Sequence, residues 1–178
     1  MPDLLRSAFH HGPVTVTLDD VTYTFPYRTA SQWMSTISGG HWALDVMRSA
    51  DAESYERFVQ RAEDGEAGPD DLQRIARAAL AEASGFHWWE AERLMSLLGE
   101  PRMLGTVLHH GADLDRLSLA AVLAIVYSLI MQGSEKDQVK VEAEISVPPP
   151  GAVTEEDGDE DFSAMVDRMR SLPGISIG

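Results

Sequence analysis

The chain has 178 residues, a formal net charge of −15, no cysteine, and hydrophobic residues at 44% of the sequence. This composition is typical of one globular domain with a real core, and the lack of cysteine excludes disulfides, thiolate metal sites and a cysteine nucleophile. Because an acidic surface repels nucleic-acid phosphate, the charge argues against nonspecific DNA or RNA binding.

No export signal or membrane span is visible in the sequence. Residues 1–12 lack a basic segment followed by a long apolar run and a small-residue cleavage site. The most apolar run, residues 119–131, has 13 residues, which is too short to cross a bilayer and more typical of a buried helix. We therefore expect a cytosolic protein that does not bind membranes.

A β-hairpin is predicted for residues 14–25, "VTVTLDDVTYTF". β-branched or aromatic residues alternate with threonine on both sides of Asp19 and Asp20, a pattern that indicates two strands joined by a tight turn. Pro26 lacks the N–H that strand pairing needs, so the hairpin should end before it.

Helices are predicted for most of the chain between the hairpin and residue 147. Thr29 and Gln32 have the spacing of a capping box, and Asp51 and Pro69 are typical starts of two later helices. Apolar residues at helical spacing follow each of these starts. Gly85 is placed to end the helix that Pro69 begins.

A helix with paired tryptophans and a very apolar helix are expected next. The first spans about residues 86–98 and contains Trp88 and Trp89. The second spans about residues 118–132 and is hydrophobic nearly all round, so we expect it to be the central element of the bundle. Residues 135–145 form a last helix or, by their alternation of valine and lysine, a strand.

The chain divides into three predicted segments. Residues 1–147 form a helical domain with the hairpin, residues 148–161 a proline-rich and acidic linker, and residues 162–178 a short tail. Six of the seven residues from Glu155 to Asp161 are acidic and none is apolar, so this part should be disordered. The predicted fold class is mainly α: a helical bundle with a small N-terminal β-hairpin and a disordered acidic C-terminal tail ending in a short amphipathic helix.

The amphipathic helix at the C-terminus carries an apolar stripe at positions i, i+3, i+4 and i+7: Phe162, Met165, Val166 and Met169. Nothing in the tail itself covers this stripe. The helix either folds back on its own domain or docks in the groove of a partner. We treat these four residues as candidate partner-binding residues.

Trp88 and Trp89 are also candidate partner-binding residues. On a helix, adjacent side chains point about 100° apart. Either both rings cover the bundle core, or one lies in the core and the other at a protein–protein surface, where such rings are common anchors.

No motif for catalysis, metal binding or cofactor binding is found. The adjacent histidines at 10–11 and 109–110 point in different directions on a helix and make no natural two-ligand metal site. The patterns GxSxG, GxGxxG and GxxxxGKS are absent, so a nucleophile elbow and a nucleotide loop have no support. We expect a non-enzymatic protein with no catalytic, metal-binding or cofactor-binding residues.

Four stretches occur in a characteristic order over roughly residues 14–170: "TFPYRTASQWMSTI", "GPDDLQRIARAALAEASGFHWWEAERLM", "LHHGADLDRLSLAAVLAIVYSLI", and "VPPPG" before an acidic linker and a Met-rich end. In this order they resemble the tail assembly chaperones of long-tailed, siphovirus-type actinobacterial phages. The most specific element is an alanine-rich helix followed, after a glycine, by the paired-tryptophan helix. The family's usual "GRPWW" is "GFHWW" here, with Phe86 and His87 in place of Arg-Pro.

The resemblance implies a non-enzymatic role in building a phage tail. Such chaperones associate with the tape measure protein, keep it soluble, help recruit tail tube subunits, and are absent from the finished virion. The implied partners are therefore the tape measure protein and the tail tube protein, and the implied location is the host bacterial cytoplasm. In many phages the gene also yields a longer frameshifted product, of which this chain would be the shorter form. The sequence leaves the oligomeric state open, a homo-oligomer included.

Two other classes of function remain as alternatives. The net charge and the acidic block at 155–161 suit an adaptor or inhibitor that binds a basic or nucleic-acid-binding protein surface, with binding that weakens steeply with salt. An enzyme of unrecognised type would need a deep pocket lined by convergent polar groups.

Overall fold

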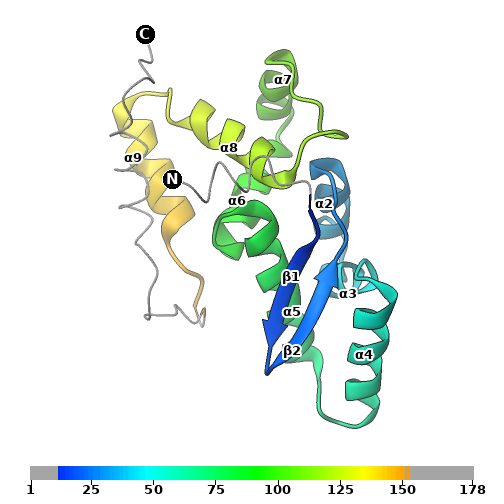
Figure 1. Cartoon of the computed structure of the whole chain (residues 1–178). Coiled ribbons are helices and arrows are strands. Elements are labelled where there is room, and N and C mark those ends of the chain that lie inside the picture. The colour runs from blue at the N-terminus through cyan, green and yellow to red at the C-terminus, as the bar shows by residue number, and fades with distance from the viewer. Residues whose placement is uncertain (1–11, 151, 153–178) are drawn as a thin grey trace, which may run out of the picture.

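A computed structural model of the chain describes residues 12–150 and 152. In this part of the chain a two-stranded sheet is followed by eight helices, from α2 to α9 (Figure 1). The structure confirms the predicted fold class in its described part, which is mainly helical with a small N-terminal antiparallel hairpin. The acidic run at 155–161 and the predicted tail, with its apolar stripe, lie outside the described residues.

The hairpin forms where it was predicted. Strands β1 (Val14–Leu18) and β2 (Val21–Phe25) pair antiparallel. The turn consists of Asp19 and Asp20, whose φ angles are 50° and 63°. Positive φ at both central residues is the conformation whose twist matches that of the flanking strands, and aspartate tolerates it better than most residues.

Helix α4 (Ala52–Glu63) covers the free edge of β2 (Figure 1). The Thr24 N–H donates to Ser54 Oγ at 2.8 Å, and the Asp51 N–H donates to the Thr24 carbonyl at 2.9 Å. Since an unpaired strand edge is a template for aggregation, these bonds protect the hairpin.

Helix α5 (Pro69–Ser84) is the element against which the hairpin lies. Strand β1 and helices α3 (Trp42–Arg48), α6 (Trp88–Leu98) and α8 (Leu119–Ile130) all pack against it. Gly85 ends α5 with a φ of 71°, a conformation that favours glycine. The largest side chains of the surrounding core are Tyr23, Phe25, Trp33, Met47, Ile75, Leu80, Leu94, Leu98, Leu119 and Leu123.

The start of helix α2 (Ala30–Ile37) is tied to the loop that precedes α8. The predicted capping box is present, with Thr29 and Gln32 each accepting a bond from the other's backbone N–H. The Ala30 N–H, which has no partner inside its own helix, donates to the Leu117 carbonyl at 2.9 Å. This bond holds the N-terminal end of α8 against the domain.

Among the described residues, the neighbouring helices bury one side of helix α8 more fully than the other, although its composition predicted a central element. Helices α2, α5, α6 and α7 (Pro101–His109) pack against this side and bury Leu119, Ala120, Val122, Leu123, Val126 and Tyr127. On another side, Ala124, Ile125 and Leu129 are only half-buried, and Ser128 and Gln132 are exposed. The expected central position is therefore seen on the core-facing side, whereas the apolar residues of this other side are only half-buried.

Residues Glu135–Ser146 form helix α9, which decides between the helix and the strand that the sequence allowed. Arg93 Nη1 of α6 donates to the Ile145 carbonyl at 2.6 Å, and the Gln138 side chain donates to the Met131 carbonyl at 2.8 Å. These bonds fix both ends of α9 to the domain. None of the helices in the described part of the chain is long and apolar enough to cross a membrane.

Replacing Asp20 by glycine should stabilise the hairpin, because glycine adopts a positive φ without the steric cost of a Cβ. We expect the free energy of unfolding, measured by urea denaturation, to rise by about 1 kcal/mol. The control is Asp64→Gly at an exposed position with a φ of −78°, which should give no gain. An equal gain in both variants, or none in Asp20→Gly, would contradict this account of the turn.

Candidate functional site

The rings of His87, Trp88 and Trp89, with Arg77 of α5, form what we call the tryptophan cluster at the start of α6. The Trp89 ring stacks on the His87 ring with centroids 4.4 Å apart and meets the Trp88 ring edge-on at 5.7 Å. The Arg77 guanidinium lies 4.1 Å from the centroid of the Trp88 ring, a cation–π contact. These three contacts link all four side chains of the cluster to one another.

The two tryptophans differ in how much surface they offer to a partner. Trp88 is half-buried and packs against the main core, whereas Trp89 is only 5% exposed and lies outside the main core cluster. The indole Nε1 of Trp89 is buried and has no hydrogen-bond partner among the residues that the structure describes. Of the two rings, Trp88 therefore has the more accessible surface, and a partner-binding role for either ring stays a prediction.

Glu90, in the first turn of α6, is a buried carboxyl. Its side chain is almost fully enclosed, and Oε2 accepts the N–H of His87, the N-cap residue of α6, at 3.1 Å. Burial raises the pKa of Glu90 to about 7, although the bond from His87 and the charge of Arg93 act in the opposite direction. Glu90 caps the helix that carries both tryptophans, and its bond with the His87 N–H stabilises the start of that helix.

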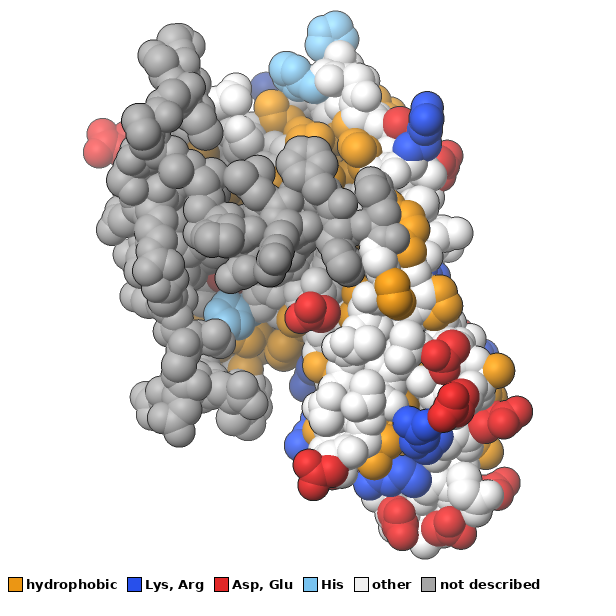
Figure 2. All heavy atoms as spheres, in the orientation of Figure 1, with side chains coloured by type: hydrophobic (Ala, Val, Ile, Leu, Met, Phe, Trp, Pro, Cys, Tyr) orange, Lys and Arg blue, Asp and Glu red, His pale blue; other side chains and the backbone are white. Residues whose placement is uncertain are grey.

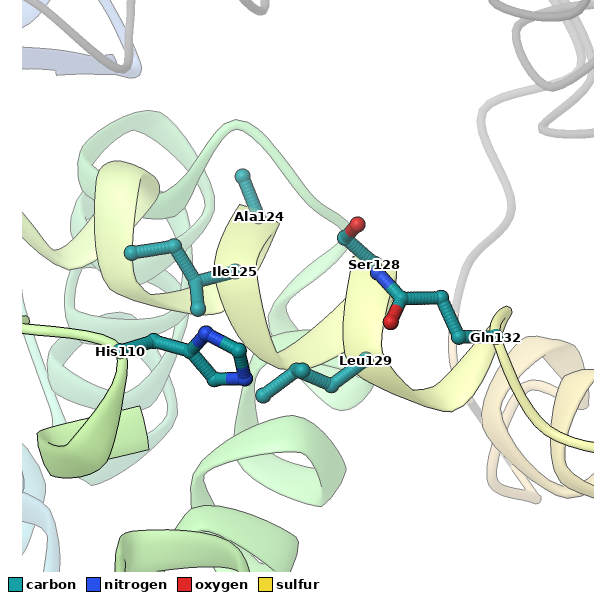
Figure 3. Close-up of a pocket in the computed structure, with 6 residues that line it drawn as sticks. All are labelled: His110, Ala124, Ile125, Ser128, Leu129 and Gln132. Atoms are coloured by element: carbon teal, nitrogen blue, oxygen red, sulfur yellow. The ribbon is translucent and has the colours of Figure 1, made fainter. Parts of the chain in front are cut away.

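A groove on α8, which we call the α8 groove, is a pocket in the described part of the chain. It has a volume of about 390 Å³. Figure 3 shows the His110 imidazole, at the end of α7, opposite the side chains of Ile125 and Leu129. The described lining residues are His110, Ala124, Ile125, Ser128, Leu129 and Gln132, and none of them is an aspartate, glutamate, lysine or arginine.

The surface around α7 and α8 carries hydrophobic side chains, whereas the surface over α4 is mainly acidic. Figure 2 shows hydrophobic side chains gathered near the histidines at the top of the view, over α7 and α8. Leu108 of α7 is 50% exposed. At the lower end, over α4 and the loop after it, acidic side chains predominate (Figure 2). A concentration of exposed apolar side chains is typical of a binding surface.

Sequence reasoning missed the α8 groove and Glu90, and it placed four of its candidate residues outside the described part of the chain. Phe162, Met165, Val166 and Met169 all lie there. The signal for the groove was the apolar run itself, which does not show which side neighbouring helices cover. The signal for Glu90 was its spacing of three residues from the N-cap His87.

The described residues contain no group of three histidine, aspartate or glutamate side chains placed to hold a metal ion. The described lining of the α8 groove consists of apolar and uncharged polar side chains with one histidine, a surface suited to contact with another mostly apolar surface. No protein-family model, no curated protein and no solved structure matches this chain.

Replacing Glu90 by glutamine keeps an oxygen that accepts the His87 N–H and removes the ionisable group. Because the folded-state pKa is raised, the stability that this group contributes is complete below pH 4.5 and is lost as the pH rises through about 7. We expect the wild type and Glu90→Gln to unfold with similar free energies near pH 4.5. At pH 8 the variant should be more stable by about 1–3 kcal/mol.

Urea denaturation at both pH values measures this difference. The same substitution at exposed Glu63 controls for the loss of one negative charge. A difference between wild type and Glu90→Gln that does not change with pH would show that the buried carboxyl does not titrate as described.

Proposed function

We propose that this protein is a non-enzymatic tail assembly chaperone of a long-tailed phage, which binds the tape measure protein, keeps it soluble and helps recruit tail tube subunits. The observation that carries the proposal is the α8 groove, a pocket whose described lining is mostly apolar, on an acidic helical domain. The order of sequence motifs that resembles this family supports the same function independently.

The groove suits one helix of a long helical partner. Its lining residues recur along α8 at 124, 125, 128 and 129, and Gln132 follows in the turn after the helix, so they form a continuous strip. A partner helix whose apolar residues recur at i, i+3, i+4 and i+7 can lie along such a strip. Since the described lining has no acidic or basic side chain except His110, the face that enters it should be largely uncharged.

The acidity of the chain has a function in this proposal. A chaperone that covers apolar segments of its partner forms a large complex, and a net charge of −15 per chain makes such complexes repel one another. The complex then stays soluble in the host cytoplasm until tail tube subunits assemble around the tape measure protein, and the chaperone is absent from the finished virion.

An acidic adaptor that binds a basic protein surface is the second candidate, favoured by the exposed acidic side chains over α4 (Figure 2). Two of these acids are already paired within the chain, Glu53 with Arg57 and Glu66 with Arg61. This local pairing weakens the attraction that an adaptor would offer to a basic partner.

Salt distinguishes the two candidates, because it screens contacts between exposed charges far more than apolar contacts. We expect the complex with the tape measure protein to survive size-exclusion chromatography at about 0.5 M NaCl, where the Debye length is only a few ångströms. A complex that forms at low salt and dissociates at 0.5 M would support the adaptor instead.

A substitution in the groove tests the proposed binding mode. Ser128 is exposed and lines the groove, so Ser128→Glu places a charge in the apolar contact with little cost to folding. On co-expression with the tape measure protein encoded downstream, the wild-type chain should raise the soluble yield of that protein and co-elute with it. Ser128→Glu should lower the affinity at least about tenfold, which corresponds to 1.4 kcal/mol.

Ser96→Glu is the matched control, since Ser96 is an exposed serine on α6 that does not line the groove. It should behave as the wild type does. If no complex forms with the wild-type chain, the proposed function is wrong. If both variants bind equally well, the function stands and the groove is not the contact.

A further inference from the structure

Two apolar surfaces of this chain have no partner assigned to them: the α8 groove and the stripe at positions 162, 165, 166 and 169. We propose that residues 162–169 dock into the α8 groove of their own chain. The free protein then covers its own binding surface, and a partner has to displace this segment.

The stripe and the groove match in chemistry. The stripe offers one phenylalanine, one valine and two methionines at the spacing of one helix face. The half-buried side chains of Ala124, Ile125 and Leu129 form the apolar floor of the groove. Methionine adapts to irregular apolar surfaces, which suits a groove whose described lining comes mainly from α8, with His110, the C-cap residue of α7, beside it.

The chain outside the described residues is long enough to make this contact. Residues 153–161 form a tether of nine residues that spans up to about 30 Å when extended. The twelve residues of α9 span only about 18 Å. The tether begins after the six residues that follow α9, which include a turn in which the Ala152 N–H donates to the Pro149 carbonyl at 3.0 Å. Because Gln138 fixes the start of α9 to the end of α8, a tether from this turn can return along α9 toward the groove.

Connection through the tether favours the chain's own segment over other occupants. A short flexible linker gives the attached segment an effective concentration on the order of millimolar, far above that of a second copy or a partner at micromolar concentration. A weak apolar contact that would not persist between separate molecules is therefore occupied within one chain. The described lining has no acidic side chain to repel the acidic tether.

Docking would hide both apolar surfaces at once. A tape measure helix that displaces the segment would free the stripe for a second contact with the same partner. This consequence rests on the proposed function, whereas the docking itself does not.

The experiment measures a distance within the full chain. The protein contains no cysteine, so two spin labels can be attached selectively to the variant His109→Cys/Ser171→Cys. His109 is exposed and neighbours the groove residue His110, and Ser171 follows the stripe. Pulsed electron paramagnetic resonance should give one narrow distance peak below about 25 Å, given that eight helical residues span about 12 Å.

Two further substitutions test which surfaces make the contact. Met165→Asp/Val166→Asp changes the stripe outside the described helices, and Ser128→Glu changes the groove; each should replace the narrow peak by a broad distribution. The matched controls, Asp167→Asn in the tail and Ser96→Glu on α6, should keep the peak.

Three outcomes would overturn the proposal. A broad distribution in the labelled parent chain means that the segment does not dock. A peak that survives Ser128→Glu places the segment elsewhere, and a peak that disappears on dilution with unlabelled chain comes from a second copy. Since no tape measure protein is present, these outcomes leave the proposed function to its own test.

Discussion

The incomplete cover of α8 is the constraint on which the functional account depends. A helix with an almost entirely apolar sequence needs neighbours on every side, and this domain packs α2, α5, α6 and α7 against one side of it. The hairpin and α3 pack on α5 instead, and α4 is used to protect the edge of β2. The half-buried side of α8 is therefore a result of how the chain is connected, and its apolar side chains can take part in binding a partner.

Helix α6 connects α8 to α5 and α9, because it packs against all three. One side of α6 packs on α5 and α8, and the N-terminal end is capped by Glu90 and surrounded by the tryptophan cluster. Arg93 on the same helix donates to the Ile145 and Val147 carbonyls, so α6 also fixes the C-terminal end of α9. The paired tryptophans thus serve first to shape this helix and its contacts, whether or not Trp88 meets a partner.

Local signals in the sequence were sufficient for the hairpin, the capping box at Thr29 and the helix end at Gly85, because each depends on a few neighbouring residues. The burial of individual faces was not predictable in this way. Sequence periodicity showed that residues 119–131 are apolar, but it did not show that Ile125 and Leu129 face a groove beside His110. The same holds for Glu90, since its enclosure depends on elements distant in the chain. The choice between helix and strand for α9 was likewise settled by packing on α6.

The central proposal is that a tape measure protein binds in the α8 groove, and site-specific photo-crosslinking tests it most directly. A benzophenone amino acid at position 128 in the full chain, co-expressed with the tape measure protein, should give a covalent adduct with that protein on irradiation. The same amino acid at position 96, also exposed but outside the groove, should give little or none. Adducts of equal yield from both positions, or an adduct from position 96 alone, would contradict the account.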